Sequence, residues 1–306
     1  MRGARLLARV VVLLAGVALV VPDSAVRPTT ISLTTIGTAK AVDAGDGPLW
    51  VLVLGSEARP GADVDGGLTD AIQLIGVASE TRRAVAIGLP RDLWVDLPDG
   101  DSSRLNAVLE DEGRDQVATE VEELLGIAPD LVLVTGSEGF LSMMGSVGDV
   151  DVESPIGFTT DDGTVAVRKG TNTFDPRQAL SYATTRDELP DGSDFLRAAD
   201  HQRLLLGVLQ RLRAAEDQEG YLEQVTLSAL GGLDTNLSPA TAFRVIASLT
   251  TVDPARTAGC IVTGSFEEVG DALVVFPDLD QARAVGADAR DDVRLQGGCR
   301  GGLTVR

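Results

Sequence analysis

Two short apolar segments, at residues 71–77 and 84–89, are separated by only six residues. Both contain the aliphatic and β-branched side chains that favour strands. A parallel pair of strands needs a crossover of a dozen residues or more, usually a helix, and six residues are too few for one. We therefore expect 71–77 and 84–89 to be antiparallel neighbours in one sheet.

Strand-like and helix-like segments alternate through the rest of the chain. Residues 50–54 and 131–134 have the pattern of buried strands, and 114–125 and 195–214 carry apolar residues at helical spacing. The further elements expected are strands at 224–229 and 272–276, a helix from 139 and a helix at 240–248. This interleaving predicts an α/β fold, a three-layer α-β-α domain with a central mixed β-sheet flanked by helices. No proline-rich linker interrupts it, so residues 48–306 are expected to form one domain.

The N-terminal residues have the composition of an export or anchor segment. Three arginines within the first nine residues precede an apolar run over 10–21, as in a secretory signal. The run is shorter than the roughly 20 residues that span a bilayer. Residues 1–22 are therefore interpreted as a signal peptide or a retained signal anchor, with a buried N-terminal helix as the alternative. Residues 23–47 are expected to be a flexible tether, because they are rich in Thr, Ser, Pro and Gly.

The chain has two cysteines, Cys260 and Cys299, and one histidine, His201. Neither cysteine belongs to a CxxC motif or has a histidine nearby, so a zinc site is not indicated. In an exported protein such a pair is expected to form a disulfide; two free buried thiols are the alternative. Because His201 is the only histidine, a Ser-His-Asp triad is also hard to build.

The charge of the chain excludes one class of partner. Acidic residues outnumber basic residues by 46 to 26, which gives a net charge of −20, and there is no stripe rich in Lys and Arg. Such a surface repels phosphate backbones, so no nucleic acid is expected as a partner. If a chain this acidic binds an anion, it has to gather its few positive charges in one place.

The expected strand pairing predicts where these charges meet. If 50–54 also runs antiparallel to 71–77, the end of the first strand, the start of the second and the end of the third share one sheet edge. The charged residues at these three positions are Glu57 and Arg59, then Asp70, then Arg91 and Asp92. Arginines and carboxylates that converge beside a glycine-rich loop at 61–67 predict a site for an anion and a metal ion.

An ordered series of motifs carries a family resemblance. In chain order they read LGSEAR at 54–59, LTD at 68–70, LPRD at 89–92, RLNA at 104–107, QALSYATTR at 178–186 and DFLRAADHQ at 194–202. Each string is short, but six in this order and at this spacing are specific together. Over about residues 49–250 the chain resembles the LytR-CpsA-Psr family of cell-envelope proteins.

The resemblance implies an activity, a cofactor and a location. Members of the family move a glycopolymer from a polyprenyl-diphosphate carrier to the cell wall, usually to peptidoglycan. By resemblance we expect a phosphotransferase or pyrophosphatase assisted by Mg²⁺ (or Mn²⁺), outside the cytoplasmic membrane and held at the membrane through its N-terminus. Its partners would be a polyprenyl-diphosphate-linked glycan and peptidoglycan or a related wall acceptor. Arginine forks suit diphosphate oxygens, and Mg²⁺ prefers carboxylate oxygens.

Position by position, the resemblance also implies roles for individual residues. The residues expected to contact the substrate are Arg59, Arg91, Arg186, Arg197 and His201. The residues expected to be catalytic are Arg91, Asp70 and Arg197. Asp70 and Glu57 would hold the metal, and Glu57 is one methylene longer than the aspartate usual in the family.

The sequence departs from the family pattern at four positions. Leu68 and Thr184 stand where arginine is expected, and Asp200 and His201 replace an arginine and a glutamine. On this reading the pocket loses three positive charges and gains a negative one. At roughly 1–3 kcal/mol per charge-assisted contact, diphosphate binding would weaken by several kcal/mol unless other groups compensate. The alternative function is therefore a non-catalytic paralogue that binds a polyprenyl phosphate and supports envelope assembly.

Overall fold

The computed structural model describes residues 29–36, 47–59, 61–186, 189, 194–215, 221, 233–238, 241, 245, 248–297, 299–300 and 302–305. The expected export or anchor segment at 1–22, the strand at 224–229 and most of the helix at 240–248 lie outside these described residues. Within the described residues, no helix has the length and apolar character needed to cross a membrane.

A mixed sheet of eight strands forms the centre of the molecule, in the order β12-β1-β7-β2-β3-β4-β13-β16. Its strands are β1 (Ile31–Thr35), β2 (Leu49–Ser56), β3 (Thr69–Ala78), β4 (Arg83–Gly88), β7 (Leu131–Thr135), β12 (Leu233–Thr235), β13 (Thr257–Ile261) and β16 (Leu303–Val305). Three neighbouring pairs are parallel, namely β1–β12, β2–β7 and β4–β13, and the other four are antiparallel.

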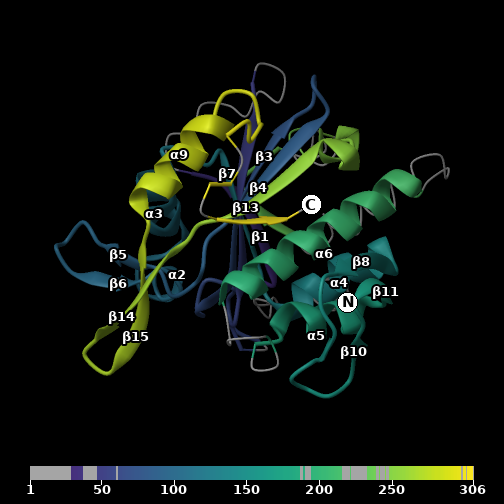
Figure 1. Cartoon of the computed structure of the whole chain (residues 1–306), viewed down its shortest axis with the longest axis horizontal. Helices are drawn as coiled ribbons and strands as arrows, with labels where there is room; N and C mark the ends of the chain where they lie inside the picture. Colours follow the sequence, from purple (N-terminus) through teal and green to yellow (C-terminus); the bar gives the residue numbers. More distant parts are fainter. Residues whose placement is uncertain are drawn as a thin grey trace, which may run out of the picture.

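Helices cover both faces of this sheet (Figure 1). On one face, α3 (Arg114–Leu125) and α9 (Leu279–Ala289) pack on each other and bury a core with the sheet. On the other face, α6 (Asp194–Ala214) packs on β3, β4 and β13, with α4 (Ser137–Val147) and α5 (Pro176–Thr184) beside it. The predicted three-layer α-β-α architecture with a mixed sheet is confirmed.

The remaining elements are short helices and two-stranded ribbons outside the central sheet. The helices are α2 (Val108–Glu112) and the 3₁₀ turn η2 (Pro254–Arg256). The ribbons pair β5 (Trp94–Asp96) with β6 (Ser102–Arg104), β8 (Val150–Ser154) with β11 (Gly170–Phe174), β9 (Phe158–Thr159) with β10 (Ala166–Val167), and β14 (Gly264–Val269) with β15 (Ala272–Pro277). The strand expected at 272–276 is thus present, but in a separate hairpin.

Part of the segment expected to be a flexible tether is a strand of the central sheet. Residues 31–35 form β1, which pairs antiparallel with β7 and parallel with β12. Ile31, Ser32 and Leu33 are all buried, so this part of the strand is covered on both faces. The tether prediction is wrong for these residues, because composition does not show which of them pair with a sheet and pack in the core.

The pairing inferred from the short connection is confirmed. Strand β3 runs antiparallel to both β2 and β4, with Leu54 opposite Ile72 and Leu74 opposite Ile87. The end of β2, the start of β3 and the end of β4 therefore lie at one edge of the sheet. We call this edge, with the residues that follow β2 and β4 and the first turn of α6, the rim.

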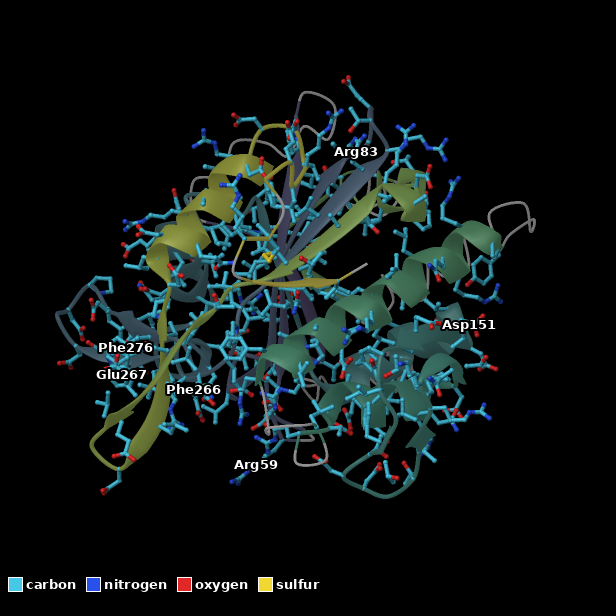
Figure 2. All side chains as sticks on the ribbon, viewed as in Figure 1. Arg59, Arg83, Asp151, Phe266, Glu267 and Phe276 are labelled. Carbon is cyan, nitrogen blue, oxygen red and sulfur yellow. A yellow bond between two sulfur atoms is a disulfide. The ribbon has the colours of Figure 1, made fainter. Side chains whose placement is uncertain are left out.

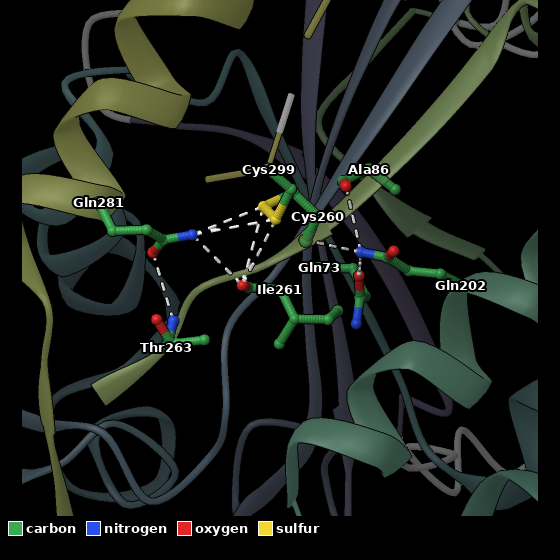
Figure 3. Close-up of a disulfide and its surroundings, with 8 residues drawn as sticks. All are labelled: Gln73, Ala86, Gln202, Cys260, Ile261, Thr263, Gln281 and Cys299. Carbon is green, nitrogen blue, oxygen red and sulfur yellow. Dashed lines mark hydrogen bonds between the residues drawn. A yellow bond between two sulfur atoms is a disulfide. The ribbon is translucent and has the colours of Figure 1, made fainter. Parts of the chain in front are cut away.

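The two cysteines form a disulfide, as expected. Cys260 lies in β13 and is joined to Cys299, which precedes β16. Figure 3 shows the sulfur atoms on one side of β13, next to Gln281, and the side chain of Gln202 on the other side. The bond therefore ties the segment that leads into β16 to a central strand.

Candidate functional site

Three charged side chains meet at the rim from three neighbouring strands. Glu57 follows β2, Asp70 lies at the start of β3, and Arg91 follows β4. Arg91 Nη1 lies 2.5 Å from Asp70 Oδ1 and 3.7 Å from Glu57 Oε1. The predicted convergence of these residues is confirmed by their geometry.

Backbone contacts fix this convergence. Asn106 is buried, its backbone oxygen accepts from the N–H of Thr69, and its own N–H donates to the carbonyl of Arg91. The residue after β2 is fixed as well, because the N–H of Glu57 donates to Leu68 O at 2.8 Å. A side chain at Gly67 would collide with the backbone of the 57–58 segment, so glycine lets the loop lie close to the rim.

Helix α6 adds a fourth and a fifth charged group. Arg197 is 2% exposed; its Nη1 lies 3.7 Å from Asp70 Oδ1, and its Nη2 lies 2.5 Å from Asp194 Oδ1. Asp194 also lies 3.7 Å from Arg91 Nε. Asp70 and Asp194 thus each lie between the same two guanidinium groups, which are held side by side.

The rim carboxylates differ in how readily they ionise. A hydrogen bond with Asp70, burial and the Asp70 charge raise the pKa of Glu57 to about 7. Burial opposes ionisation of Asp70, but the hydrogen bond with Glu57 and the charges of Arg197 and Arg91 lower its pKa overall. Burial and a hydrogen bond with Asp92 raise the pKa of Asp194 to about 6. Near neutral pH the rim therefore has two carboxylates poised between their charged and neutral forms.

Two buried N–H donors at the rim, Nε of Arg91 and Nη1 of Arg197, lack a hydrogen-bond partner among the described residues. Their nearest carboxylate oxygens, of Asp194 and Asp70, lie 3.7 Å away, beyond hydrogen-bond distance. Buried polar groups in proteins are nearly always hydrogen-bonded, so unpaired N–H groups on two adjacent arginines need an explanation. An anion bound against both guanidinium groups would satisfy them.

The other two arginines predicted to contact the substrate are Arg186 and Arg59, and their positions relative to the rim differ. Arg186 follows α5, and its charge acts on both Glu57 and Asp70. Its backbone N–H donates to Asp161 Oδ2 at 2.7 Å. Arg59 is exposed and forms no ion pair within the described part of the chain. In Figure 2 it lies at the end of the sheet opposite to Arg83, the first residue of β4.

His201 is buried one helical turn after Arg197. Its Nε2 lies 2.8 Å from the carbonyl oxygen of Ala183, on the last turn of α5, and its Nδ1 has no partner among the described residues. Burial and the nearby charge of Arg197 lower the pKa of His201 to about 4. The ring is therefore neutral at pH 7, and it links α6 to the segment that carries Arg186.

The negative charge expected from Asp200 does not enter the site. Asp200 Oδ1 accepts from the Tyr182 hydroxyl at 2.6 Å and from Arg203 Nη1 at 2.5 Å. Its charge is thus compensated by a neighbour on its own helix. The expectation that Asp200 adds a negative charge to the pocket is wrong, because its side chain is bonded to Tyr182 of α5 and to Arg203, three residues further along its own helix.

At the other two departures from the family pattern, the local geometry is ordinary. Leu68 lies half-buried just before β3. Thr184 is exposed at the end of α5, where its hydroxyl donates to Leu180 O at 3.0 Å. Neither position supplies a charge, so the rim depends on Arg91, Arg197 and Arg186.

Sequence reasoning missed Asp194 as a site residue. It belongs to one of the quoted motifs, three residues before Arg197, which is the spacing of neighbours on a helix face. That spacing shows the pairing with Arg197, but it does not show that α6 begins beside the end of β4. Contact with Arg91 depends on the tertiary fold.

An apolar cavity of about 190 Å³ lies between α6 and the sheet. Strands β3, β4 and β13 and the segment ending at Val305 form one wall, and leucines of α6 form the other. Gln202 also lines it and donates to Gln73 Oε1 at 3.0 Å. Gln202 is five residues beyond Arg197, about 7.5 Å along the helix axis. The cavity therefore lies behind the charged rim, with the hydrogen-bonded side chains of Gln73 and Gln202 between the rim and most of its lining residues.

Few side chains at the rim could serve as ligands for a metal ion. Among the described residues there is no cluster of three or more His, Cys, Asp or Glu side chains with metal-binding geometry. The hydrogen-bonded pair of Glu57 and Asp70 offers two carboxylates. Mg²⁺ keeps several waters and takes one or two carboxylates together with substrate phosphates, so these residues fit Mg²⁺ in the presence of a diphosphate.

Comparison with known proteins agrees with this arrangement. The polyisoprenyl-teichoic acid–peptidoglycan teichoic acid transferase TagU of Bacillus anthracis is 28% identical over 193 residues, which are 62% of this chain and 61% of that protein. The chain thus spans less than two thirds of that relative. The transferase TagT of Bacillus subtilis is 28% identical over 231 residues, 72% of this chain and 70% of its own length.

A solved structure shares the fold. The family protein YwtF (TagT) with bound octaprenyl pyrophosphate superposes with a TM-score of 0.61 at 20% identity, over 84% of this chain and 95% of that one. The model of the LytR_cpsA_psr family matches residues 25–281. This chain therefore belongs to the LytR-CpsA-Psr family.

Proposed function

We propose that this protein transfers a glycopolymer from a polyprenyl-diphosphate carrier to peptidoglycan or a related wall acceptor. One juxtaposition carries the proposal. Two guanidinium groups lie at the rim, that of Arg197 buried and that of Arg91 half-buried, and each has an N–H without a hydrogen-bond partner among the described residues. An apolar cavity lies further along α6, from Gln202 onward, about 7.5 Å beyond Arg197 along the helix axis. A charged head joined to a long apolar tail is the ligand that matches both parts.

The names of two relatives support the same function. TagU and TagT are named for transfer of a polyisoprenyl-linked teichoic acid to peptidoglycan, and the structure of TagT contains octaprenyl pyrophosphate. By analogy, the diphosphate of the donor would lie against Arg91 and Arg197, with Arg186 nearby. The polyprenyl tail would enter the cavity between α6 and the sheet.

The reaction needs little covalent chemistry from the protein. A hydroxyl oxygen of the acceptor forms a bond to the phosphorus next to the glycan, and the bond from that phosphorus to the bridging oxygen breaks. The polyprenyl monophosphate leaves, and the hydroxyl proton passes to water. Phosphoryl transfer has a loose transition state, in which positioning and charge stabilisation dominate. Arg91 and Arg197 would supply that stabilisation, and Asp194 would hold the two guanidinium groups in place.

Asp70 and Glu57 would hold a Mg²⁺ ion (or Mn²⁺) at the rim. Bound there, the ion would neutralise diphosphate charge that the three arginines leave uncompensated. The proposal is supported by the pKa of about 7 for Glu57, which reflects two carboxylates in contact. Two such groups become compatible in their charged forms when a cation lies between them.

The reaction would take place outside the cytoplasm, at the membrane that holds the lipid carrier. Two observations support this location. The disulfide between Cys260 and Cys299 is typical of oxidising compartments. Residues 1–22, outside the described part of the chain, have the composition of an export signal or anchor.

Turnover of a minimal lipid donor tests the proposal. The purified full chain is incubated with geranylgeranyl diphosphate and Mg²⁺, and phosphate release and ligand binding are both measured. Arg91→Ala and Asp70→Ala are expected to lower turnover at least tenfold, because each loses a charge-assisted contact of about 1.5–3 kcal/mol. Arg83→Ala is the matched control, since Arg83 lies at the opposite end of β4.

The same assay separates the enzyme from a binding paralogue. The observation that favours the binding paralogue is that Leu68 and Thr184 stand where the family has arginine. Binding of geranylgeranyl diphosphate without any phosphate release in the parent protein would establish a carrier-binding role. Absence of both binding and release would refute both functions.

A further inference from the structure

Part of one wall of the apolar cavity, Val305, comes from a segment beyond the residues that the family model matches. The family model ends at residue 281, whereas Cys299 and strand β16 follow it. Strand β16 extends the central sheet beyond β13. It pairs antiparallel with β13, with Val305 opposite Gly259 and Thr304 opposite Cys260.

Val305 lies where the cavity approaches the rim. It is 5% exposed and belongs to a small apolar cluster with Ala198, Ala199 and Ile261. Ala198 directly follows Arg197, the buried arginine of the rim. Val305 also lines the cavity. A tail that leaves a diphosphate at Arg197 and enters the cavity would therefore pass beside this side chain and that of Gln202, which lines the same end of the cavity.

The neighbouring strand β13 has no side chain at this part of the cavity wall. Gly259 also lines the cavity, and any side chain there would collide with the carboxamide of Gln202. With glycine at this position, the side chain of Val305 supplies the apolar surface on this part of the sheet. The width of this end of the cavity thus depends on the side chains of Val305 and Gln202.

The disulfide holds this wall in place. Strand β16 contributes three residues to its pairing with β13, and so short an edge strand is weak by itself. Cys299, six residues before Val305, is bonded to Cys260, the residue next to Gly259 in β13. The covalent bond keeps the segment from Cys299 to Val305 against β13, with the sulfur atoms on the side away from Gln202 (Figure 3).

We infer that Val305 is a specificity-determining residue for the apolar tail of the substrate, positioned by the disulfide between Cys260 and Cys299. The inference rests on the proposed function, because it assigns the cavity to a polyprenyl tail. It adds that the end of the cavity nearer the rim is shaped by a side chain outside residues 25–281, the part of the chain that the family model matches. Tail selection is then separable from recognition of the diphosphate head.

Binding of two probes to the full chain tests this role. Geranylgeranyl diphosphate reports on head and tail together, and inorganic diphosphate reports on the head alone. Val305→Trp is expected to weaken binding of geranylgeranyl diphosphate at least tenfold and to leave binding of inorganic diphosphate within twofold. Thr304→Trp is the matched control, because Thr304 is exposed on the same strand; its binding of both probes should equal that of the parent.

Each outcome of these binding measurements tests a different claim. If Val305→Trp binds geranylgeranyl diphosphate as tightly as Thr304→Trp does, the role of Val305 is refuted while the proposed function stands. If the parent binds neither probe, the proposed function fails and the inference fails with it. If Val305→Trp does not fold, Val305→Ala decides: the ratio of geranylgeranyl to farnesyl diphosphate affinity should change at least threefold, and an unchanged ratio overturns the inference.

The disulfide has a test of its own. In Cys260→Ser/Cys299→Ser the wall is held only by the short ladder, so affinity for geranylgeranyl diphosphate should fall at least threefold, with binding of inorganic diphosphate unchanged. Equal loss for both probes would show a general loss of folding and would contradict the positioning role. The midpoint of thermal unfolding is measured for every variant in parallel.

Discussion

Glu57 stands at the rim with a carboxylate on one side and an arginine on the other. Its hydrogen bond with Asp70 and its burial raise its pKa, and the 3.7 Å contact with Arg91 Nη1 opposes them without outweighing them. An aspartate at this position would be one methylene shorter. The longer side chain allows Glu57 to share a proton with Asp70, which makes the pair sensitive to pH and to cations.

Glu57→Gln is expected to stabilise the protein in a pH-dependent way. The folded pKa of Glu57, about 7, lies above its ordinary value of 4.5, so its protonated form stabilises the fold at low pH and that contribution is lost as the pH rises through 7. The thermal midpoint of Glu57→Gln minus that of the parent should therefore be larger at pH 8 than at pH 5. The exposed Glu122→Gln serves as control and should show no such difference.

Magnesium gives this variant a second readout. At pH 8, Mg²⁺ together with inorganic diphosphate should raise the thermal midpoint of the parent, because the ion would relieve repulsion between Glu57 and Asp70. The increase should be smaller in Glu57→Gln, which has one ionisable ligand fewer. Equal increases in both proteins would contradict the assignment of Glu57 as a metal ligand.

Thr184 offers a test of the missing positive charge. It is exposed, two residues before Arg186, so an arginine there can point toward the rim without displacing a core residue. Thr184→Arg is expected to tighten binding of geranylgeranyl diphosphate about fivefold, the effect of one charge-assisted contact worth about 1 kcal/mol. Thr119→Arg makes the same charge change at an exposed position of α3. If this variant improves binding equally, the gain comes from net charge and not from the site.

At the scale of single elements, α6 organises the whole site. Its first turn carries Asp194 and Arg197 at the rim, and its middle lines the apolar cavity. Between these parts, Asp200 ties α6 to α5 through the hydroxyl of Tyr182. One helix thus fixes the distance between the charged head and the apolar tail of a ligand.

Asp200→Ala is expected to destabilise the protein and to leave the site intact. Asp200 is 3% exposed, and its removal leaves the Tyr182 hydroxyl and Arg203 without their partner, which costs about 3–5 kcal/mol for a buried pair. Urea unfolding should show this loss. Binding of inorganic diphosphate at low denaturant should stay within twofold of the parent. A large loss of binding with little loss of stability would show instead that Asp200 acts in the pocket.

The same elements show what the sequence could predict and what it could not. The short connection expected at residues 78–83 was enough to predict the pairing of β3 and β4, and the pairing placed Asp70 beside Arg91. These are local constraints of chain length. Asp194 reaches Arg91 across about a hundred residues, and its approach depends on how α6 packs on the sheet. The contact of Asp200 with Tyr182 and the wall formed by Val305 likewise follow from packing and not from spacing.

At the scale of the whole molecule, the rim gathers arginines and carboxylates in one place within a negative field. The chain carries a net charge of −20, and most of that charge is distant from Arg91 and Arg197. Charges on the surface act through solvent and are screened by salt, whereas close contacts at a partly buried site are screened much less. Approach of an anionic ligand and its retention are therefore governed by different charges.

This separation predicts an unusual dependence on salt. The association rate constant for geranylgeranyl diphosphate should rise about threefold or more between 20 and 200 mM NaCl, because screening weakens the repulsion from the rest of the molecule. A site on a basic protein would show the opposite trend. Stopped-flow measurements of the parent and of Thr119→Arg test this, and the variant should show a slightly weaker salt dependence because its net charge is one unit less negative. An association rate that falls with salt in both proteins would mean that the arginines of the rim dominate even at long range, and that the surface charge has no part in the approach of the ligand.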